Sequence, residues 1–176
     1  TDTVYLPAIA GTSSTNTITF NGGDSATTTL AYNTAAVNQN AVILMDGADY
    51  VSFENLTITH PGTTDSWGIR MQNDNDNFTV DACRFEMALT TSTSSDIATI
   101  ASTGSATSSF TETEGGDNTT IINSAFINGQ YGVHFEALAA FSDSNFVIND
   151  NTFEGNYYRH FMSDNTYNMT LNGNTM

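Results

Sequence analysis

Basic residues and cysteine are almost missing from this sequence of 176 residues. Lysine is absent, and the three arginines, Arg70, Arg84 and Arg159, stand against 19 acidic residues, giving a formal net charge of −16 at pH 7. A surface this negative repels phosphate backbones and anionic lipid headgroups, so we expect no nucleic-acid binding and no polybasic membrane attachment. The single cysteine, Cys83, excludes a disulfide scaffold.

Long apolar runs are missing too. No run approaches the roughly 18 apolar residues that a membrane span needs, so we expect no membrane insertion. Hydrophobic residues nevertheless make up 39% of the chain and charged residues only 12%, so the chain can bury a core. The polar residues are mainly threonine, asparagine, serine and glycine, which favour strands and turns over helix interiors. This composition predicts an all-β domain and suits a secreted or cell-surface protein.

One pattern of nine residues occurs five times. Four copies begin with asparagine, and positions four and nine are large and apolar in all five. The copies start 27, 41, 27 and 23 residues apart. A second short strand, such as WGIRMQ from Trp67 or YGVHFE from Tyr131, lies between successive copies. The copies are Tyr50–Ile58, Asn77–Phe85, Asn118–Phe126, Asn145–Phe153 and Asn168–Met176.

Short strands that return at this interval with the same residue types are typical of a parallel β-solenoid, whose stacked coils form continuous apolar columns. A β-sandwich or jelly roll also has short strands, but it would not repeat the same residue types at the same offsets. We therefore predict a right-handed, single-stranded parallel β-helix of about six coils of 23–27 residues. It occupies residues 1–176 as one domain, which we expect to be a segment of a longer chain or assembly.

The interval of 41 residues exceeds a normal coil by about 14 to 18 residues. The excess falls in stretches rich in serine, threonine and glycine. We predict that residues 88–116 form a coil with inserted loops. Long loops on rigid scaffolds often carry function.

The run from Asn40 to His60, with the strand Asn16–Phe20 before it, resembles the right-handed parallel β-helix repeats of secreted and cell-surface proteins of Bacteroidota. Pectate-lyase-like enzymes share that fold. The resemblance implies an extracellular location but no single activity, because this fold carries lyases, hydrolases, adhesins and inert stalks. It also implies O-glycosylation acceptors at Thr3 and Ser25, each of which follows an aspartate.

The second strand of each coil contains the candidate binding residues. If its positions three and five face inward, positions two, four and six face outward. Position four then stacks Leu44, Arg70, Ile100, His134 and His160. In a sugar-binding groove an aromatic ring would stack on the sugar, an arginine would bind a sugar carboxylate, and His134 or Glu136 would be the acid or base. The alternative is the solvated exterior of a β-helix. The carbohydrate-binding candidates are Arg70, Gln72, His134, Glu136, Tyr158 and His160.

Other chemistry has less support in the sequence. The run Asn73–Asn77 resembles half of a Ca²⁺ loop, because oxygen ligands alternate along it. It lacks the central glycine and the bidentate glutamate, so we expect no cofactor, and weak Ca²⁺ binding through Asp74 and Asp76 is the one metal hypothesis. We expect Cys83, in a corner of the coil, to be an inert thiol. We predict no catalytic residues and lean against an enzyme.

The last repeat stops at Met176, at a position that belongs to the core in every earlier copy. A β-solenoid needs a polar cap at each end, because bare edge strands invite pairing. We therefore expect continuation of the same chain or end-to-end self-association, which would propagate into a filament. The leading hypothesis is an extracellular structural or adhesive β-helix. The alternative is a polysaccharide-active β-helix enzyme or a carbohydrate-binding module, with a polysaccharide as partner.

Overall fold

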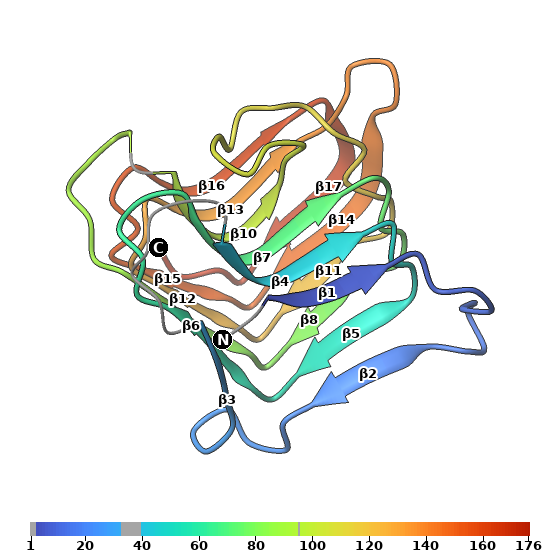
Figure 1. The fold of residues 1–176 in the computed structure, drawn as a ribbon, viewed down its shortest axis with the longest axis horizontal. Coiled ribbons are helices and arrows are strands. Elements are labelled where there is room, and N and C mark those ends of the chain that lie inside the picture. The colour runs from blue at the N-terminus through green and yellow to red at the C-terminus, as the bar shows by residue number, and fades with distance from the viewer. Residues whose placement is uncertain (1–2, 33–39, 95) are drawn as a thin grey trace.

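Three parallel sheets wind around one core in the computed structural model, which describes residues 3–32, 40–94 and 96–176 (Figure 1). The described residues form 17 strands and no helix. Each of the first five coils contributes one strand to each sheet in turn, the sixth contributes a strand to two of the sheets, and neighbouring strands in every sheet are parallel. The molecule is a parallel β-helix, and the predicted fold class is confirmed.

Sheet 1 contains β1 (Val4–Pro7), β4 (Asn40–Asp46), β7 (Ser66–Gln72), β10 (Ile97–Ser102), β13 (Tyr131–Glu136) and β16 (Arg159–Asp164). Sheet 2 contains β2 (Ile18–Asn21), β5 (Val51–Glu54), β8 (Thr79–Asp81), β11 (Thr120–Ile122), β14 (Asp143–Asn149) and β17 (Thr166–Asn172). Sheet 3 contains β3 (Thr29–Ala31), β6 (Thr57–His60), β9 (Arg84–Met87), β12 (Ala125–Ile127) and β15 (Thr152–Glu154). We number the coils 1 to 6, from β1–β3 to the pair β16 and β17.

The nine-residue pattern builds the core. Its fourth position lies in sheet 2 and its ninth in sheet 3, and each forms one column through the coils. In sheet 3 the rings of Phe85, Phe126 and Phe153 stack with centroid distances of 5.1 and 4.9 Å. All three rings are buried, so each coil covers the apolar face of its neighbour.

Left-handed backbone conformations explain why asparagine recurs at the corners. The first position of the pattern has a positive φ in all five copies, including Asn77 (60°) and Asn118 (61°). The sixth position has one too, as in Asn55 (52°), Asn123 (53°) and Gly173 (67°). Asparagine and glycine tolerate this conformation better than other residues. The corner sequence is therefore fixed by backbone geometry as well as by side-chain bonding.

The seventh position of the pattern forms a buried ladder at the corner between sheets 2 and 3. The Ser124 amide donates to Asn151 Oδ1 (2.9 Å), and the Asn151 amide donates to Asn174 Oδ1 (3.0 Å). Cys83 occupies the same position in coil 3, and its amide donates to Ser124 Oγ (3.1 Å). Burial raises the pKa of its thiol to about 11, which disfavours the reactive thiolate.

The register of sheet 1 differs from the predicted one in two strands. Ile100, and not Thr99, pairs with Ile69, so Ala101 takes the position next to Arg70. In β16 the residue that pairs with Val133 is Phe161 rather than Arg159. In β10 the shift is one residue, which exchanges the two faces of the strand and turns Ile100 toward the main core. In β16 the shift is two residues, and it packs Phe161 against the core beside Val133. The outward column is therefore Leu44, Arg70, Ala101, His134 and Met162.

Two loops flank β10 in the long fourth coil. The second, residues 103–119, folds back over the outer face of sheet 1 (Figure 1, yellow). The Thr113 amide donates a hydrogen bond to the Glu136 carbonyl (3.0 Å), and Thr113 forms an isolated parallel β-bridge with Ala137. We refer to residues 103–113 as the covering loop.

Candidate functional site

The outer face of sheet 1 contains a second apolar cluster, separate from the main core. Ala98 and Ala101 lie between the two largest members, Trp67 on β7 and Tyr131 on β13. Trp67 and Tyr131 are 0% and 1% exposed. This face was predicted to carry solvated or ligand-binding side chains, but its middle coils are packed like a small core. We call it the outer strip, and it comprises Trp67, Arg70, Gln72, Tyr131, His134 and Glu136.

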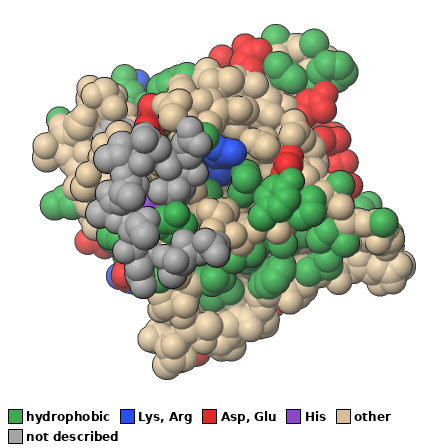
Figure 2. Space-filling view, viewed as in Figure 1, with side chains coloured by type: hydrophobic (Ala, Val, Ile, Leu, Met, Phe, Trp, Pro, Cys, Tyr) green, Lys and Arg blue, Asp and Glu red, His purple; other side chains and the backbone are tan. Residues whose placement is uncertain are grey.

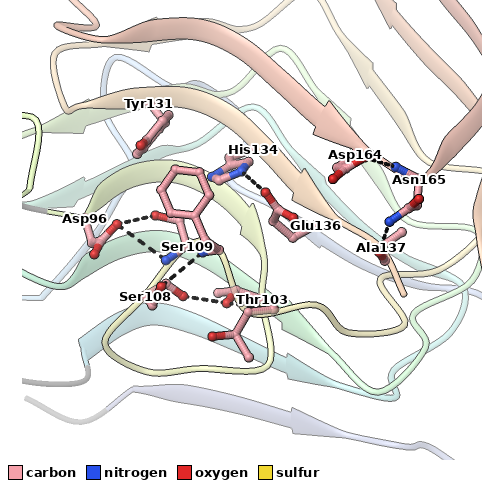
Figure 3. A network of polar contacts seen from close by, with 12 residues as sticks. Asp96, Thr103, Ser108, Ser109, Tyr131, His134, Glu136, Ala137, Asp164 and Asn165 are labelled. Atoms are coloured by element: carbon pink, nitrogen blue, oxygen red, sulfur yellow. Dashed lines mark hydrogen bonds and ion pairs between the residues drawn. The ribbon is translucent and has the colours of Figure 1, made fainter. Parts of the chain in front are cut away.

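The covering loop packs on the C-terminal half of the outer strip. The Phe110 ring lies 4.9 Å from the His134 ring and 5.9 Å from the Tyr131 ring, edge-on to both. Asp96, just before β10, holds the covering loop in place, because Ser109 Oγ of the loop donates a hydrogen bond to Asp96 Oδ1 (2.6 Å; Figure 3). Thr103 Oγ1 closes the loop by donating to the Ser108 carbonyl (2.6 Å). The loop thus separates His134 from solvent.

His134 and Glu136 point toward each other along β13 (Figure 3). His134 is fully buried and Glu136 is 6% exposed, and His134 Nε2 lies 3.0 Å from Glu136 Oε1. Burial lowers the pKa of His134 to about 4 and raises the pKa of Glu136. His134 is therefore neutral near pH 7 and donates from Nε2 to the carboxylate. This pairing could position a general base, but the covering loop lies between it and solvent.

Arg70 is a buried cation without a carboxylate in contact. It is 8% exposed, and its Nη2 donates to Gln72 Oε1 (3.1 Å). Its guanidinium lies 5.8 Å from the centroid of the Trp67 ring, and no described acidic side chain lies within ion-pair distance of it. Burial lowers the pKa of Arg70. Burial of an unpaired charge is costly, so Arg70 is the least satisfied charged residue of the outer strip.

Three buried polar atoms of the outer strip have no hydrogen-bond partner. They are Trp67 Nε1, Arg70 Nε and His134 Nδ1. Most buried polar groups in proteins are bonded, so each exception needs an explanation. Here all three side chains belong to one face of one sheet. This arrangement is compatible with a polar ligand that binds there when the covering loop moves.

Two of the predicted binding residues lie outside this arrangement. Tyr158 is in the turn before β16, is 43% exposed and meets the Tyr131 ring edge-on at 5.8 Å. His160 does not stack on His134, because Met162 pairs with His134. His160 Nδ1 instead lies 3.2 Å from Asn156 Oδ1. The prediction of one column containing both histidines is wrong, because the register of β16 is shifted by two residues.

Sequence reasoning missed Asp96, Phe110 and Tyr131. Asp96 and Phe110 lie in loops, where no periodicity indicates which strand a side chain will contact. Tyr131 was identified as the start of a strand, and its alignment with Trp67 in one outward column was a usable signal.

An acidic cavity of about 260 Å³ lies beside the turn that connects sheets 1 and 2. Burial raises the pKa of Asp74 to about 6 and that of Asp143, which is 4% exposed, to about 7. The Gly115 amide donates to Asp143 Oδ2 (3.1 Å). The cavity is lined by Asp74, Glu114, Asp117, Phe141, Ser142 and Asp143.

Only one of the two candidate Ca²⁺ ligands lines this cavity. Asp74 lines the cavity, whereas Asp76 does not line it and accepts a hydrogen bond from the Asp117 amide of the next coil (2.7 Å). Across the described ranges, no group of three or more His, Cys, Asp or Glu side chains is arranged to hold a metal ion.

The two candidate glycosylation sites lie in coil 1. Thr3 is half-buried and its hydroxyl donates to the Ala41 carbonyl (2.8 Å), so it is already engaged. Ser25 is half-buried in the turn between β2 and β3. Glycosylation at these residues stays a prediction.

No protein-family model, curated protein or solved structure matches this chain. The parallel β-helix therefore rests on the structure itself, and the resemblance to Bacteroidota surface proteins and pectate-lyase-like enzymes stays a prediction. In the part of the chain that is described, no helix has the length and hydropathy to cross a membrane.

Proposed function

We propose that this protein is a structural β-helix that acts outside the cell, as a rigid segment of a secreted or cell-surface assembly. The observation that carries the proposal is the continuity of the core columns through all six coils. Each coil is held by its neighbours over its whole cross-section, which makes a stiff rod. The acidic composition supports the same role, since like charges keep rods from associating sideways.

Surface labelling of intact source cells tests this proposal. An antibody against the purified protein is expected to label unpermeabilised cells or to detect the chain in the medium. Protease added outside the cells is expected to remove the surface signal, while a cytoplasmic marker stays intact. A signal that appears only after lysis would refute the extracellular role.

A second candidate function is binding of a carboxylated sugar at the outer strip. The unpaired Arg70 and the three unpartnered polar atoms favour it. In this hypothesis Arg70 binds the carboxylate and Trp67 packs against the sugar ring, after the covering loop has moved away.

Fluorescence of Trp67, the single tryptophan, provides the measurement for this second function. Titration with uronic-acid oligosaccharides is expected to change its emission in a saturable way, and Arg70→Gln is expected to weaken binding about tenfold or more, on the scale of one charged hydrogen bond. Arg84→Gln is the matched control, because Arg84 is an exposed arginine paired with Glu86 at 2.5 Å. No saturable change in the wild-type protein, or equal effects of both variants, would exclude the hypothesis.

A further inference from the structure

We infer that the covering loop is a lid over His134 and Glu136, and that this lid opens when Asp143 in the acidic cavity loses its proton. The inference goes beyond the proposed structural role, and it does not depend on which ligand the outer strip binds. The residues involved belong to coils 3 to 5, which are stacked between other described coils.

The covering loop is closed by its own hydrogen bonds. Thr103 Oγ1 donates to the Ser108 carbonyl (2.6 Å), and the Gly104 amide donates to the Thr111 carbonyl (2.9 Å). Loops that are closed and packed by their own side chains form compact units. Such a unit can move on its two stems, at Thr103 and Thr113, and keep its internal bonds.

Few contacts hold the loop between these stems. Among the described residues 104–112, Ser109 alone forms hydrogen bonds to the rest of the chain, from its hydroxyl and its amide to Asp96 Oδ1 (2.6 and 3.4 Å; Figure 3). Phe110 adds ring contacts but is 49% exposed. Segments with few buried contacts are the ones that open locally. Opening would also let water reach His134 Nδ1, which is buried without a partner while the loop is closed.

The second stem connects the covering loop to the acidic cavity. The Leu138 amide donates to the Thr113 carbonyl (3.1 Å), so Thr113 is joined to coil 5. Two residues later, the Gly115 amide donates to both carboxylate oxygens of Asp143 (3.2 and 3.1 Å). A Cβ atom at Gly115 would lie only 2.4 Å from Asp143 Oδ2, so glycine is needed for this approach. A displacement of Gly115 from Asp143 therefore reaches the stem of the lid within two residues.

Asp143 faces like charges from two other segments. Asp74 lies in the turn after β7, and Glu114 and Asp117 lie in the segment before β11. The described residues that line the cavity include no arginine or histidine. Acidic side chains gather on this edge of the molecule in Figure 2 (right). Protonated Asp143 is a neutral group at a site where it is 4% exposed, whereas ionised Asp143 adds a buried charge among like charges.

The direction of the pH effect follows from linkage. Burial raises the pKa of Asp143 to about 7 while the cavity is closed, and contact with water on opening returns it toward 3.8. Opening thus releases a proton and becomes more favourable as the pH rises. From pH 5 to pH 7 the opening equilibrium is expected to grow by up to about fiftyfold, and it levels off above pH 7.

Other titratable groups also face the lid. Burial lowers the pKa of His134 to about 4, so its protonation favours opening at low pH, which is the opposite direction. Burial raises the pKa of Glu136, which acts in the same direction as Asp143. The experiment must therefore separate Asp143 from both groups. The remaining charged residues near this pair are Asp96, Glu112 and Asp164.

Labelling of His134 with diethylpyrocarbonate, read by mass spectrometry of its peptide, reports the opening, because the reagent needs a neutral imidazole nitrogen that solvent reaches. The rate is measured from pH 5 to pH 8 on protein shown to be folded by circular dichroism. At each pH it is divided by the rate of Asp143→Asn, which cancels the titration of His134 and Glu136 that both proteins share. This ratio is expected to rise by up to about fiftyfold from pH 5 to pH 7.

Two further cavity and loop variants sharpen this measurement. Glu112→Gln removes a charge from an exposed residue of the covering loop and is expected to show the wild-type ratio. Asp74→Asn removes one like charge from the cavity and leaves Asp143 in place, so a smaller rise than in the wild type is expected. A ratio that does not change with pH, or a His134 that stays unlabelled in the wild type at every pH, would overturn the inference.

The contact between the loop and Asp96 gives a test that does not depend on pH. Ser109→Ala is expected to speed labelling of His134 about tenfold or more at every pH, on the scale of one charged hydrogen bond. Thr111→Ala, which removes an exposed hydroxyl from the same loop, is the matched control and is expected to label like the wild type. Equal rates for the two variants would contradict a lid held by Ser109.

Phe126→Ala separates local opening from unfolding of the whole helix. Phe126 is fully buried in the main core, away from the covering loop, so its truncation destabilises the coils and leaves the lid contacts in place. Labelling of His134 is expected to stay at the wild-type rate. A rate that rises with the loss of global stability would show that His134 is reached only by unfolding, and would overturn the inference. These results are independent of surface labelling of cells, so either proposal can fail alone.

Discussion

Phe126→Ala is expected to lower the free energy of unfolding by about 3–5 kcal/mol, the usual loss when a buried aromatic ring is truncated. Phe126 is fully buried, and its ring lies between those of Phe85 (5.1 Å) and Phe153 (4.9 Å). Its removal leaves a cavity in coil 4 and weakens the contacts with the coils on both sides. Urea unfolding, followed by Trp67 fluorescence and far-ultraviolet circular dichroism, measures the change.

Phe110→Ala is the matched control for this prediction. It removes the same side chain from the covering loop, where Phe110 is 49% exposed. The expected loss is about 1 kcal/mol, since half of the ring is already in contact with water. Equal losses for the two variants would mean that the covering loop contributes as much to stability as the phenylalanine column, which contradicts the assignment of the core.

The repeat made the fold predictable from the sequence. Residues such as Phe85 and Phe126 recur at one offset because each must cover the same position of the previous coil. The asparagines at Asn77 and Asn118 recur for a different reason, because the corner needs a left-handed backbone. Two independent requirements, an apolar residue over each core position and a left-handed backbone at each corner, therefore repeat at the same interval. A β-sandwich would impose neither requirement at a fixed interval.

The register of sheet 1 could not be predicted in the same way. Thr99 and Ile100 are adjacent in a strand whose residues are all buried, so alternation does not tell which one faces the core. In coil 6 the tyrosines at Tyr157 and Tyr158 look like the start of a strand, but β16 begins at Arg159. The register is fixed by pairing with the neighbouring coil and by the length of the preceding turn. Both depend on contacts distant in sequence.

The candidate site was predictable only as a set of strand positions. The alternation of residues along the strands correctly placed Arg70 and His134 in one outward column. It gave no sign, however, that these outward side chains are buried. The covering loop changes this, because it brings Phe110 onto His134 from a segment with no periodic pattern. A loop that folds back leaves no signal in the strands that it covers. Burial of the outer strip therefore needed the structure.

The wild-type protein is expected to lose stability as the pH rises, because Asp143 is buried. Asp143→Asn is expected to abolish this part of the loss. Burial raises the pKa of Asp143 from 3.8 to about 7, so between these values the unfolded chain releases a proton that the folded chain keeps. Stability therefore falls from about pH 4 to pH 7, by up to about 4 kcal/mol at 1.36 kcal/mol per pH unit. At pH 8 the variant is expected to be more stable than the wild type, and near pH 4 the two should be similar. Urea unfolding at several pH values measures this.

Protonation of His134 changes the free energy of unfolding in the same experiment, but with the opposite dependence on pH. Burial lowers its pKa from 6.5 to about 4, so its contribution to stability is lost as the pH falls through that range. In the wild-type protein the His134 effect opposes the Asp143 effect between pH 4 and 6.5. Asp143→Asn removes the Asp143 effect, so the variant should lose more stability on acidification than the wild type does. Glu112→Gln, which removes a charge from an exposed residue of the covering loop, should leave the wild-type profile unchanged. Identical profiles for Asp143→Asn and Glu112→Gln would show that the acidic cavity does not hold the proton on Asp143.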